Sequence, residues 1–295
     1  MDQTSQTTME PAPAAAGPTF ALALGGGGAR GLAHIHVLEA LDDLGVKPTV
    51  IAGSSIGAII GAAYAAGMTG AEIREFAVHT LGRGAAVAGR MWRARPQSFA
   101  EMLDGGVRFG QFNVERILRS FLPDHLPQRF EDLSIPLKVT ATDYFAHELV
   151  VLQAGDLIHA LAASSALPAV FLPVRRDGRL LIDGGYCDPV PFDLVMDDAD
   201  MVIAVDVVGA PLAQQPKIPN SIDLTLGANQ ILMQSIISLK LKESRPAILL
   251  RPPVSGFGVL DFLKVGKVLE ETRSIRDETK RAIEAAIARH QAPQA

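Results

Sequence analysis

The sequence predicts an α/β protein with three layers, in which helices cover both faces of a central, mostly parallel sheet. Short apolar runs typical of buried strands alternate with segments of helical periodicity along most of the chain. Hydrophobic residues make up 48% and charged residues 20% of the 295 positions, which is ordinary for a protein with a packed core. Glycine-rich turns follow several of the apolar runs, and in such sheets function gathers at the carboxyl ends of strands.

The elements of the first half follow from apolar spacing and from turn residues. Leu32, Leu38 and Leu41 fall at helical spacing, and Gly45 is a natural helix end. In chain order we expect a strand at 20–24, a helix from 32 to 44, a strand at 49–52, and helices at 56–66, 70–81 and 114–122.

The second half continues the alternation and adds one hairpin. Asp177-Gly178 is a strong signal for a two-residue turn, with arms at 171–175 and 179–182. The other expected elements are strands at 137–142, 148–152, 201–207 and 247–250, and helices at 157–163, 224–242 and 261–290.

The chain divides into a tail, one domain and a terminal helix. Residues 1–18 are polar and rich in proline and alanine, without the basic start of a signal peptide, and we expect them to be disordered. Residues 19–260 form the α/β domain. Residues 261–295 form an amphipathic helix with a frayed end, which we expect to pack on the domain and to take no part in the site.

Charge and cysteine content limit the possible partners and the compartment. The formal net charge is −5, so nothing attracts the chain to nucleic acid as a whole. The single cysteine, Cys187, excludes an intrachain disulfide framework and suits a cytoplasmic protein. The uncharged segment between Lys47 and Glu72 imitates a membrane span, but its strand runs into a turn at Gly53 and leaves a helix too short to cross a bilayer.

The first candidate site is the glycine run 25–28, between a strand and a helix. Successive glycines let backbone amides converge on an anion, and the helix after them adds its positive end. Gly26, Gly28 and Gly31 also match the dinucleotide-binding pattern. That pattern requires an acidic residue at the end of the next strand, and the sequence has none there, so nucleotide binding is the weaker alternative.

The second candidate is Gly53-Ser54-Ser55-Ile56-Gly57, where a strand must turn sharply into a helix. This is the setting of a nucleophile elbow, which would expose Ser55 above the helix N-terminus. The alternative is that Ser54 or Ser55 only caps the helix. The neighbouring glycine run favours the elbow.

The third candidate is Asp183-Gly184-Gly185, which follows the apolar arm of the hairpin and puts a carboxylate at a strand end. A second Asp-Gly-Gly begins at Asp104, but it follows a helix-like run and is better explained as a helix end. None of the histidines carries a local catalytic signature; they are His34, His36, His79, His125, His147, His159 and His290. The sequence therefore points to Asp183, and not to a histidine, as the base for Ser55.

Together, Gly25–Gly31, Gly53–Gly57 and Asp183–Gly185 resemble the motifs of the patatin-like phospholipase family, and in particular those of its short bacterial members. The resemblance extends from about Phe20 to Val207 and includes the stretch 163–168. It implies lipid acyl hydrolase activity without a metal, a cofactor or a catalytic histidine. By this resemblance Ser55 is the nucleophile, Asp183 is the base, and the amides of Gly26, Gly27 and Gly28 form the oxyanion hole.

The resemblance leaves three questions open. The fold could instead serve a lipid-binding or acyl-binding protein without turnover. Arg30 stands in the first helical turn, where it opposes the helix dipole, so it needs a partner: a lipid phosphate, or a carboxylate such as Asp206. The stretch 82–95 holds four arginines and Trp92, and it is either a contact with anionic membrane beside the site or a solvated basic loop. Oligomeric state and the identity of the lipid do not follow from the sequence.

Overall fold

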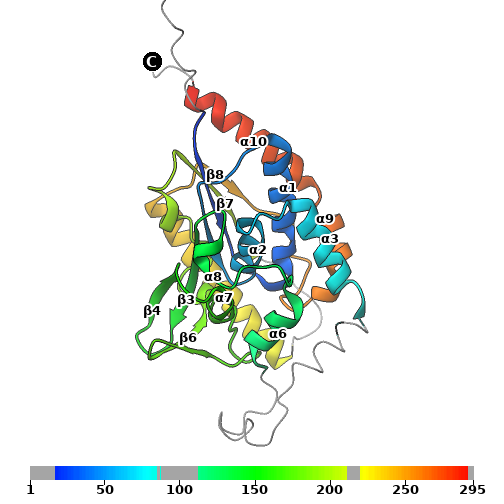
Figure 1. The fold of residues 1–295 in the computed structure, drawn as a ribbon, viewed down its shortest axis with the longest axis vertical. Coiled ribbons are helices and arrows are strands. Elements are labelled where there is room, and N and C mark those ends of the chain that lie inside the picture. The colour runs from blue at the N-terminus through cyan, green and yellow to red at the C-terminus, as the bar shows by residue number, and fades with distance from the viewer. Residues whose placement is uncertain (1–16, 85–86, 88–111, 211–219, 292–295) are drawn as a thin grey trace, which may run out of the picture.

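A computed structural model describes residues 17–84, 87, 112–210 and 220–291 and confirms the α/β fold (Figure 1). Within these residues the sheet has eight strands in the order β5-β6-β3-β2-β1-β7-β8, with β4 also paired to β3. The strands are β1 Phe20–Leu24, β2 Val50–Ser54, β3 Leu137–Asp143, β4 Glu148–Leu152, β5 Val174–Arg176, β6 Arg179–Asp183, β7 Met201–Val205 and β8 Ile248–Leu250. Strands β1, β2, β3, β7 and β8 are parallel, whereas β4, β5 and β6 pair antiparallel.

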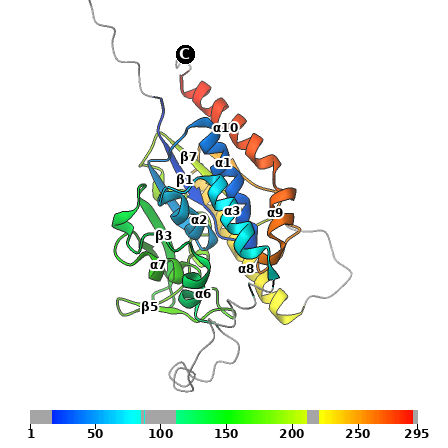
Figure 2. The ribbon, with the colours of Figure 1, turned by 45° about the vertical axis from the view of Figure 1, so that its right-hand side comes forward.

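Helices cover the sheet on both faces. They are α1 His34–Leu44, α2 Ile56–Ala65, α3 Gly70–Leu81, α6 Val114–Phe121, α7 Leu157–Ser164, α8 Ser221–Glu243, α9 Val265–Glu271 and α10 Ser274–Gln291. A 3-10 turn, Gly28–Ala33, connects the glycine run to α1. Helices α3 and α10 pack against α1, and α9 packs against α3 and the 3-10 turn. Figure 2 shows these four helices together on one side of the sheet.

Alternate residues of the central strands face two separate cores. On β1, Leu22 and Leu24 point into the larger core with α1 and α2, while Ala21 and Ala23 point toward Ile237 on α8. Every residue of β1 is buried, as is usual for a parallel strand that helices cover on both sides.

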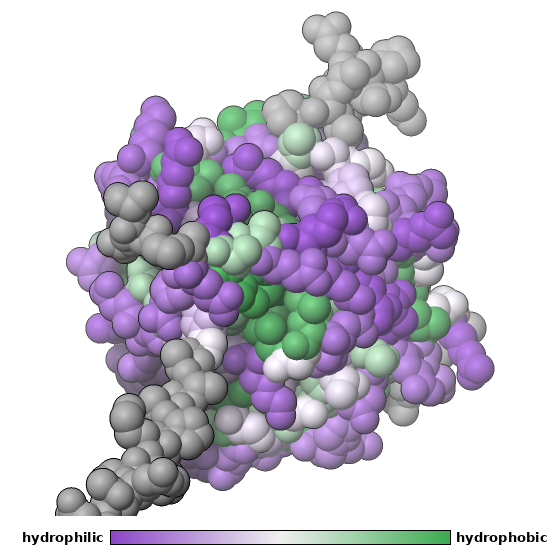
Figure 3. Space-filling model, turned by 90° about the horizontal axis from the view of Figure 1, so that it is seen from above, coloured by the Kyte–Doolittle hydropathy of each residue, from purple (hydrophilic) through white to green (hydrophobic). Residues whose placement is uncertain are grey.

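The surface is mainly hydrophilic on the face shown in Figure 3, with a hydrophobic area exposed between the hydrophilic residues.

Strand β3 pairs with two different strands, one after the other, along the same edge. Residues 137–140 of β3 pair with β2, residues 141–143 pair with β6, and β4 occupies the opposite edge over residues 139–143. Strand β6 therefore begins to pair where β2 has ended. This arrangement brings Asp183, the last residue of β6, next to the carboxyl end of β2.

The segment after Asp183 is fixed to α8 by one lysine. Lys240 forms ion pairs with Asp188 and Asp193 and donates a hydrogen bond to the Val190 carbonyl at 3.0 Å. Its ammonium group also lies 4.8 Å from the centre of the Phe192 ring. These contacts attach the far end of α8 to the chain that leaves the predicted base.

Two predicted elements differ from the structure. The first hairpin arm is the shorter β5, because Pro173 has no N–H to donate to a strand pair. The predicted helix 261–290 is broken into a 3-10 turn, α9 and α10. The break follows Glu271, where the Thr272 hydroxyl donates to the carbonyl of Val268 one turn back.

Several predictions fall wholly or partly outside the described residues. They concern the tail at 1–16, Asp104, and positions 88–95 of the basic stretch, including Trp92. Among the helices that the structure describes, none has both the length and the apolar character needed to cross a bilayer.

We expect α10 to stabilise the domain through burial of its inner face against α1. Ile283 is completely buried there, so Ile283→Ala should lower the free energy of unfolding by about 2–5 kcal/mol. Urea denaturation followed by circular dichroism measures this change. The exposed neighbour Glu284 provides the control, because Glu284→Ala removes no buried surface and should leave the midpoint nearly unchanged. Equal midpoints for the two variants would contradict the packing role.

Candidate active site

Ser55 occupies the predicted elbow between β2 and α2. Its backbone has φ 53° and ψ −124°, a conformation that residues with a side chain rarely adopt. Gly57 makes the turn possible, because a Cβ at this position would collide with the carbonyl of Leu24. The side chain of Ser55 does not cap α2, so the alternative of a helix cap is wrong.

The Ser55 hydroxyl donates a hydrogen bond of 2.7 Å to Oδ2 of Asp183. The other carboxylate oxygen, Oδ1, accepts the N–H of Gly185 at 2.8 Å. Asp183 is thus held from both sides, and the two residues predicted to act together are in direct contact although they lie 128 positions apart.

The segment 164–166 connects the two residues through its backbone and one side chain. Ser164 Oγ accepts the N–H of Ser55 at 2.8 Å, and the carbonyl of Ala166 accepts the N–H of Asp183 at 3.2 Å. The sequence pointed to this stretch only as a supporting motif. Its contacts show that it fixes the relative position of Ser55 and Asp183.

Burial controls the protonation of Asp183. The residue is 3% exposed, and loss of solvation raises the pKa of its carboxyl to about 6, against the opposing effect of the hydrogen bonds from Ser55 and Gly185. A carboxylate with a pKa near neutrality accepts a proton from a hydroxyl more readily than an ordinary aspartate does.

The glycine run lies beside Ser55, and its amides differ in availability. The N–H of Gly26 donates to the Pro189 carbonyl at 2.9 Å, so the prediction that Gly26 contributes to an oxyanion hole is wrong. Gly25 donates to Val205 in the same way, at 3.0 Å. The N–H groups of Gly27 and Gly28 have no hydrogen-bond acceptor among the described residues, and Gly28 has a φ of 59° that suits glycine.

The remaining motif glycines allow close packing around these groups. A Cβ at Gly31 would strike Ile56, one at Gly53 would strike Ala58, and one at Gly184 would strike Thr140. Gly185 faces Met233 of α8.

Arg30 binds backbone carbonyls and not the carboxylate of Asp206, the predicted protein partner. Its Nε donates to the carbonyl of Phe257 at 2.7 Å, and Nη1 donates to that of Val208 at 2.5 Å. Asp206 pairs instead with Arg251 at 3.1 Å. Burial lowers the pKa of Arg30, and the charge of Asp261 opposes that effect. The guanidinium thus connects the turn after the glycines to two loops, because its fixed donors suit two carbonyls from different segments.

None of the histidines lines the cavity beside Ser55 within the described residues. His34 is completely buried, and its Nε2 lies 2.8 Å from the carbonyl of Gly25. Since a carbonyl only accepts, Nε2 carries the proton. Burial lowers the pKa of His34 to about 4, so the ring is neutral near pH 7. His34 is therefore placed to hold the glycine run and not to contact Ser55.

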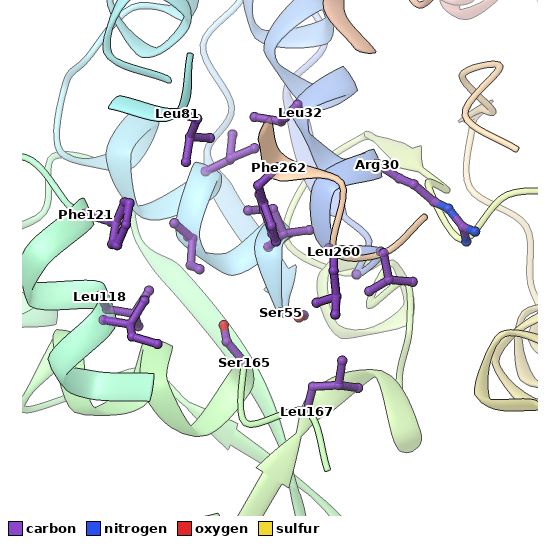
Figure 4. A pocket seen from close by; sticks show the side chains of 18 of the residues that line it. Arg30, Leu32, Ser55, Leu81, Leu118, Phe121, Ser165, Leu167, Leu260 and Phe262 are labelled. Atoms are coloured by element: carbon purple, nitrogen blue, oxygen red, sulfur yellow. The ribbon is translucent and has the colours of Figure 1, made fainter. Parts of the chain in front are cut away.

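An apolar cavity of about 500 Å³ opens beside Ser55 and Asp183 (Figure 4). Helices α2, α3, α6 and α8 contribute to its wall, and its polar side chains are few. Leu81 and Val87 also line it, so the start of the basic stretch does border the site. Among the described residues, no group of three or more His, Cys, Asp or Glu is placed to hold a metal ion.

The C-terminal part of the chain contributes to this cavity, which the sequence did not reveal. Leu260, Phe262 and Leu263 line it, so the prediction that residues from 261 onward take no part in the site is wrong. From α8 come Leu226, Asn229, Gln230 and Met233. The apolar residues among them are equally typical of core packing, so no signal in the sequence distinguished the two roles.

Known proteins are similar to this chain in sequence and in fold. An uncharacterized NTE family protein of Mycobacterium bovis is 39% identical over 210 residues, which cover 68% of this chain and 54% of that protein. A protein named Lysophospholipase NTE1 in Coccidioides immitis is 30% identical over 284 residues, covering 86% of this chain and 17% of that protein. The chain thus spans about half the length of the mycobacterial relative and a smaller share of the fungal one.

The structure of VipD from Legionella pneumophila has the same fold, with a TM-score of 0.52 and 15% identity over 92% of this chain and 67% of that one. The family model described as Patatin-like phospholipase matches residues 22–196, which include Ser55, Asp183 and the glycine run. This chain belongs to the patatin-like phospholipase family.

Proposed function

We propose that this protein is a serine lipid acyl hydrolase that cleaves fatty-acyl esters through an acyl-enzyme on Ser55. The observation that carries the proposal is the 2.7 Å hydrogen bond from the Ser55 hydroxyl to the buried Asp183, at one side of an apolar cavity. The names of the relatives support it, since they include a lysophospholipase and patatin-like phospholipase domain proteins.

The first half of the reaction forms the acyl-enzyme. Asp183 takes the proton of Ser55 as Oγ attacks the ester carbonyl carbon, and negative charge develops on the carbonyl oxygen. The N–H groups of Gly27 and Gly28 are the donors available for this charge. When the tetrahedral intermediate collapses, the bond from carbon to alkoxy oxygen breaks, and the proton on Asp183 passes to the departing oxygen.

The second half releases the fatty acid. Water attacks the acyl-enzyme, gives its proton to Asp183, and the Ser55 oxygen leaves with that proton. The cavity is suited to bind a long acyl chain, because its apolar wall can replace water around the hydrocarbon. Peripheral contact with anionic membrane through residues 82–95 remains a prediction.

Ser55 should be the one serine that a fluorophosphonate probe labels. Ser55→Ala should abolish labelling and ester hydrolysis, because within the described residues no other hydroxyl donates to the carboxylate of the predicted base. Asp183→Asn keeps nearly the same shape and should fold normally, yet turnover should fall by roughly 10³-fold or more, as on loss of a triad member. Mass spectrometry of labelled peptides and hydrolysis of a short chromogenic ester test this. Specific lipid binding by a protein that neither labels nor turns over would support the non-catalytic alternative.

The pH dependence of kcat/KM should report the protonation of Asp183. The pKa of about 6 belongs to the free protein, and only the unprotonated carboxylate can accept the proton of Ser55. Hydrolysis should therefore rise with pH to a plateau above the pKa and fall about tenfold per pH unit well below it. Initial rates in overlapping buffers, with a check that the protein remains folded, measure the profile. A flat profile through pH 6 would sink this assignment of the base.

His34 should act only by holding the glycine run. In His34→Gln the amide nitrogen can replace Nε2 as the donor to Gly25, so activity should stay within roughly tenfold of wild type. His34→Ala leaves a buried carbonyl without a donor and should lower both the melting temperature and the activity. Parallel assays with Asp183→Asn provide the comparison. A folded His34→Gln variant as inactive as Asp183→Asn would contradict this purely supporting role.

A further inference from the structure

The hydroxyl of Ser165 is buried beside the active site without a hydrogen-bond partner. The residue is 7% exposed, and its Oγ has no partner among the described residues. It lines the cavity that also exposes Ser55 and Asp183. An unsatisfied buried hydroxyl destabilises the fold, and a bound ligand that accepts its hydrogen bond removes this cost.

The neighbours of Ser165 fix where this hydroxyl lies. Ser164 accepts the N–H of Ser55, and Ala166 accepts the N–H of Asp183, so Ser165 stands between two contacts that hold the reacting residues. In Figure 4 its oxygen points into the cavity, and Ser165 and Arg30 lie on opposite sides of Ser55. The hydroxyl therefore shares the cavity with Ser55 and Asp183, next to the contacts that hold these two residues.

An ester bound for attack by Ser55 presents two oxygens, and they have different needs. The carbonyl oxygen requires donors such as the amides of Gly27 and Gly28, which have no acceptor among the described residues. The alkoxy oxygen requires a donor as its bond to carbon breaks. Within the described residues, Ser165 supplies an unengaged hydroxyl that lines the same cavity as Ser55 and is separate from these amides.

We propose that Ser165 is a substrate-binding residue whose hydroxyl donates a hydrogen bond to the alkoxy oxygen of the ester. This inference rests on the proposed function. As the carbon–oxygen bond breaks, its electron pair stays on the alkoxy oxygen, which then receives from Asp183 the proton that Ser55 gave up. Ser165 keeps its own proton and stabilises the charge on the departing oxygen. The substrates that need this help are esters of aliphatic alcohols, such as the glycerol esters of lipids.

The test compares two esters that share one acyl chain and differ in their leaving group. A nitrophenolate leaves readily without a hydrogen bond, whereas the alkoxide of a monoacylglycerol does not. Ser165→Ala should therefore lower kcat/KM roughly 10- to 100-fold for the monoacylglycerol but only about threefold or less for the nitrophenyl ester. Ser165→Thr keeps a hydroxyl and should restore much of the difference. The ratio kcat/KM is chosen because it includes acylation and excludes deacylation.

Thr80 provides a matched control. It lies on α3, lines the same cavity, and also carries a buried hydroxyl without a partner among the described residues. Thr80→Val should change kcat/KM by the same factor for both esters, because this hydroxyl lies on a different wall of the cavity. The melting temperature of Ser165→Ala should equal or exceed that of wild type, since the variant removes an unsatisfied buried group.

Equal losses of Ser165→Ala on the two esters would overturn the role at the leaving group. A lowered melting temperature together with equal losses would assign Ser165 a structural role instead. Wild-type protein that hydrolyses neither ester and does not react with the fluorophosphonate probe would refute the proposed function itself. These outcomes are distinguishable because the nitrophenyl ester measures Ser55 and Asp183 without depending on Ser165.

Discussion

The geometry of the site depends on how β3 divides one of its edges between β2 and β6. The first four residues of β3 pair with β2, and the last three pair with β6 in the opposite direction. The carboxyl ends of β2 and β6 therefore face each other at one point of the sheet. Because Ser55 follows the first and Asp183 ends the second, the hydrogen bond between them requires no long side chain and no third residue. The aspartate reaches the serine directly, and this contact is what the proposed mechanism uses in place of a triad of three residues.

This arrangement destabilises the folded state locally, and packing of the surrounding core must offset the loss. The positive φ of Ser55 costs roughly 1–3 kcal/mol in a residue with a side chain, and close packing around Gly57 prevents the turn from relaxing. Burial of Asp183 acts in the same direction. Its folded pKa of about 6 lies above the value in the unfolded chain, so the folded state binds more protons in the intervening range. Its contribution to stability is thus largest at low pH and declines as the pH rises through 6. The ionised carboxylate therefore lowers the free energy of unfolding in the same pH range in which it can accept a proton. Such a loss of stability in exchange for reactivity is usual at a catalytic site.

Much of this fold follows from local rules, and the exceptions arise where distant segments decide the outcome. The strands at 20–24 and 148–152 and the Asp177-Gly178 turn were predictable because apolar runs and turn residues act within a few positions. Ser55 and Asp183 were recognisable for the same reason, since each lies in a glycine motif at a strand end. The partners of Arg30 were not, because carbonyls at positions 208 and 257 leave no trace in residue type. The Gly26 amide is likewise occupied by a carbonyl 163 positions away. The break after Glu271 leaves no local signal, because Thr279 forms the same bond to a carbonyl one turn back as Thr272 and yet lies inside the unbroken α10.

The groups proposed to carry the chemistry and those proposed to hold the lipid come from different parts of the chain. Ser55, Asp183, the glycine run and Ser165 all lie within the residues that match the family model, 22–196. Part of the cavity wall lies beyond it, on α8 and on the segment from Val259 to Leu263. The two parts meet at a few contacts: the carbonyl of Val259 accepts the N–H of Ala29 at 2.8 Å, and Arg30 binds Phe257. These contacts attach the cavity wall directly to the turn that follows Gly27 and Gly28. Substitutions at Leu260 or Leu263 can therefore alter the cavity proposed for an acyl chain without touching Ser55, whereas changes at the Val259 contact would reach the proposed oxyanion donors as well.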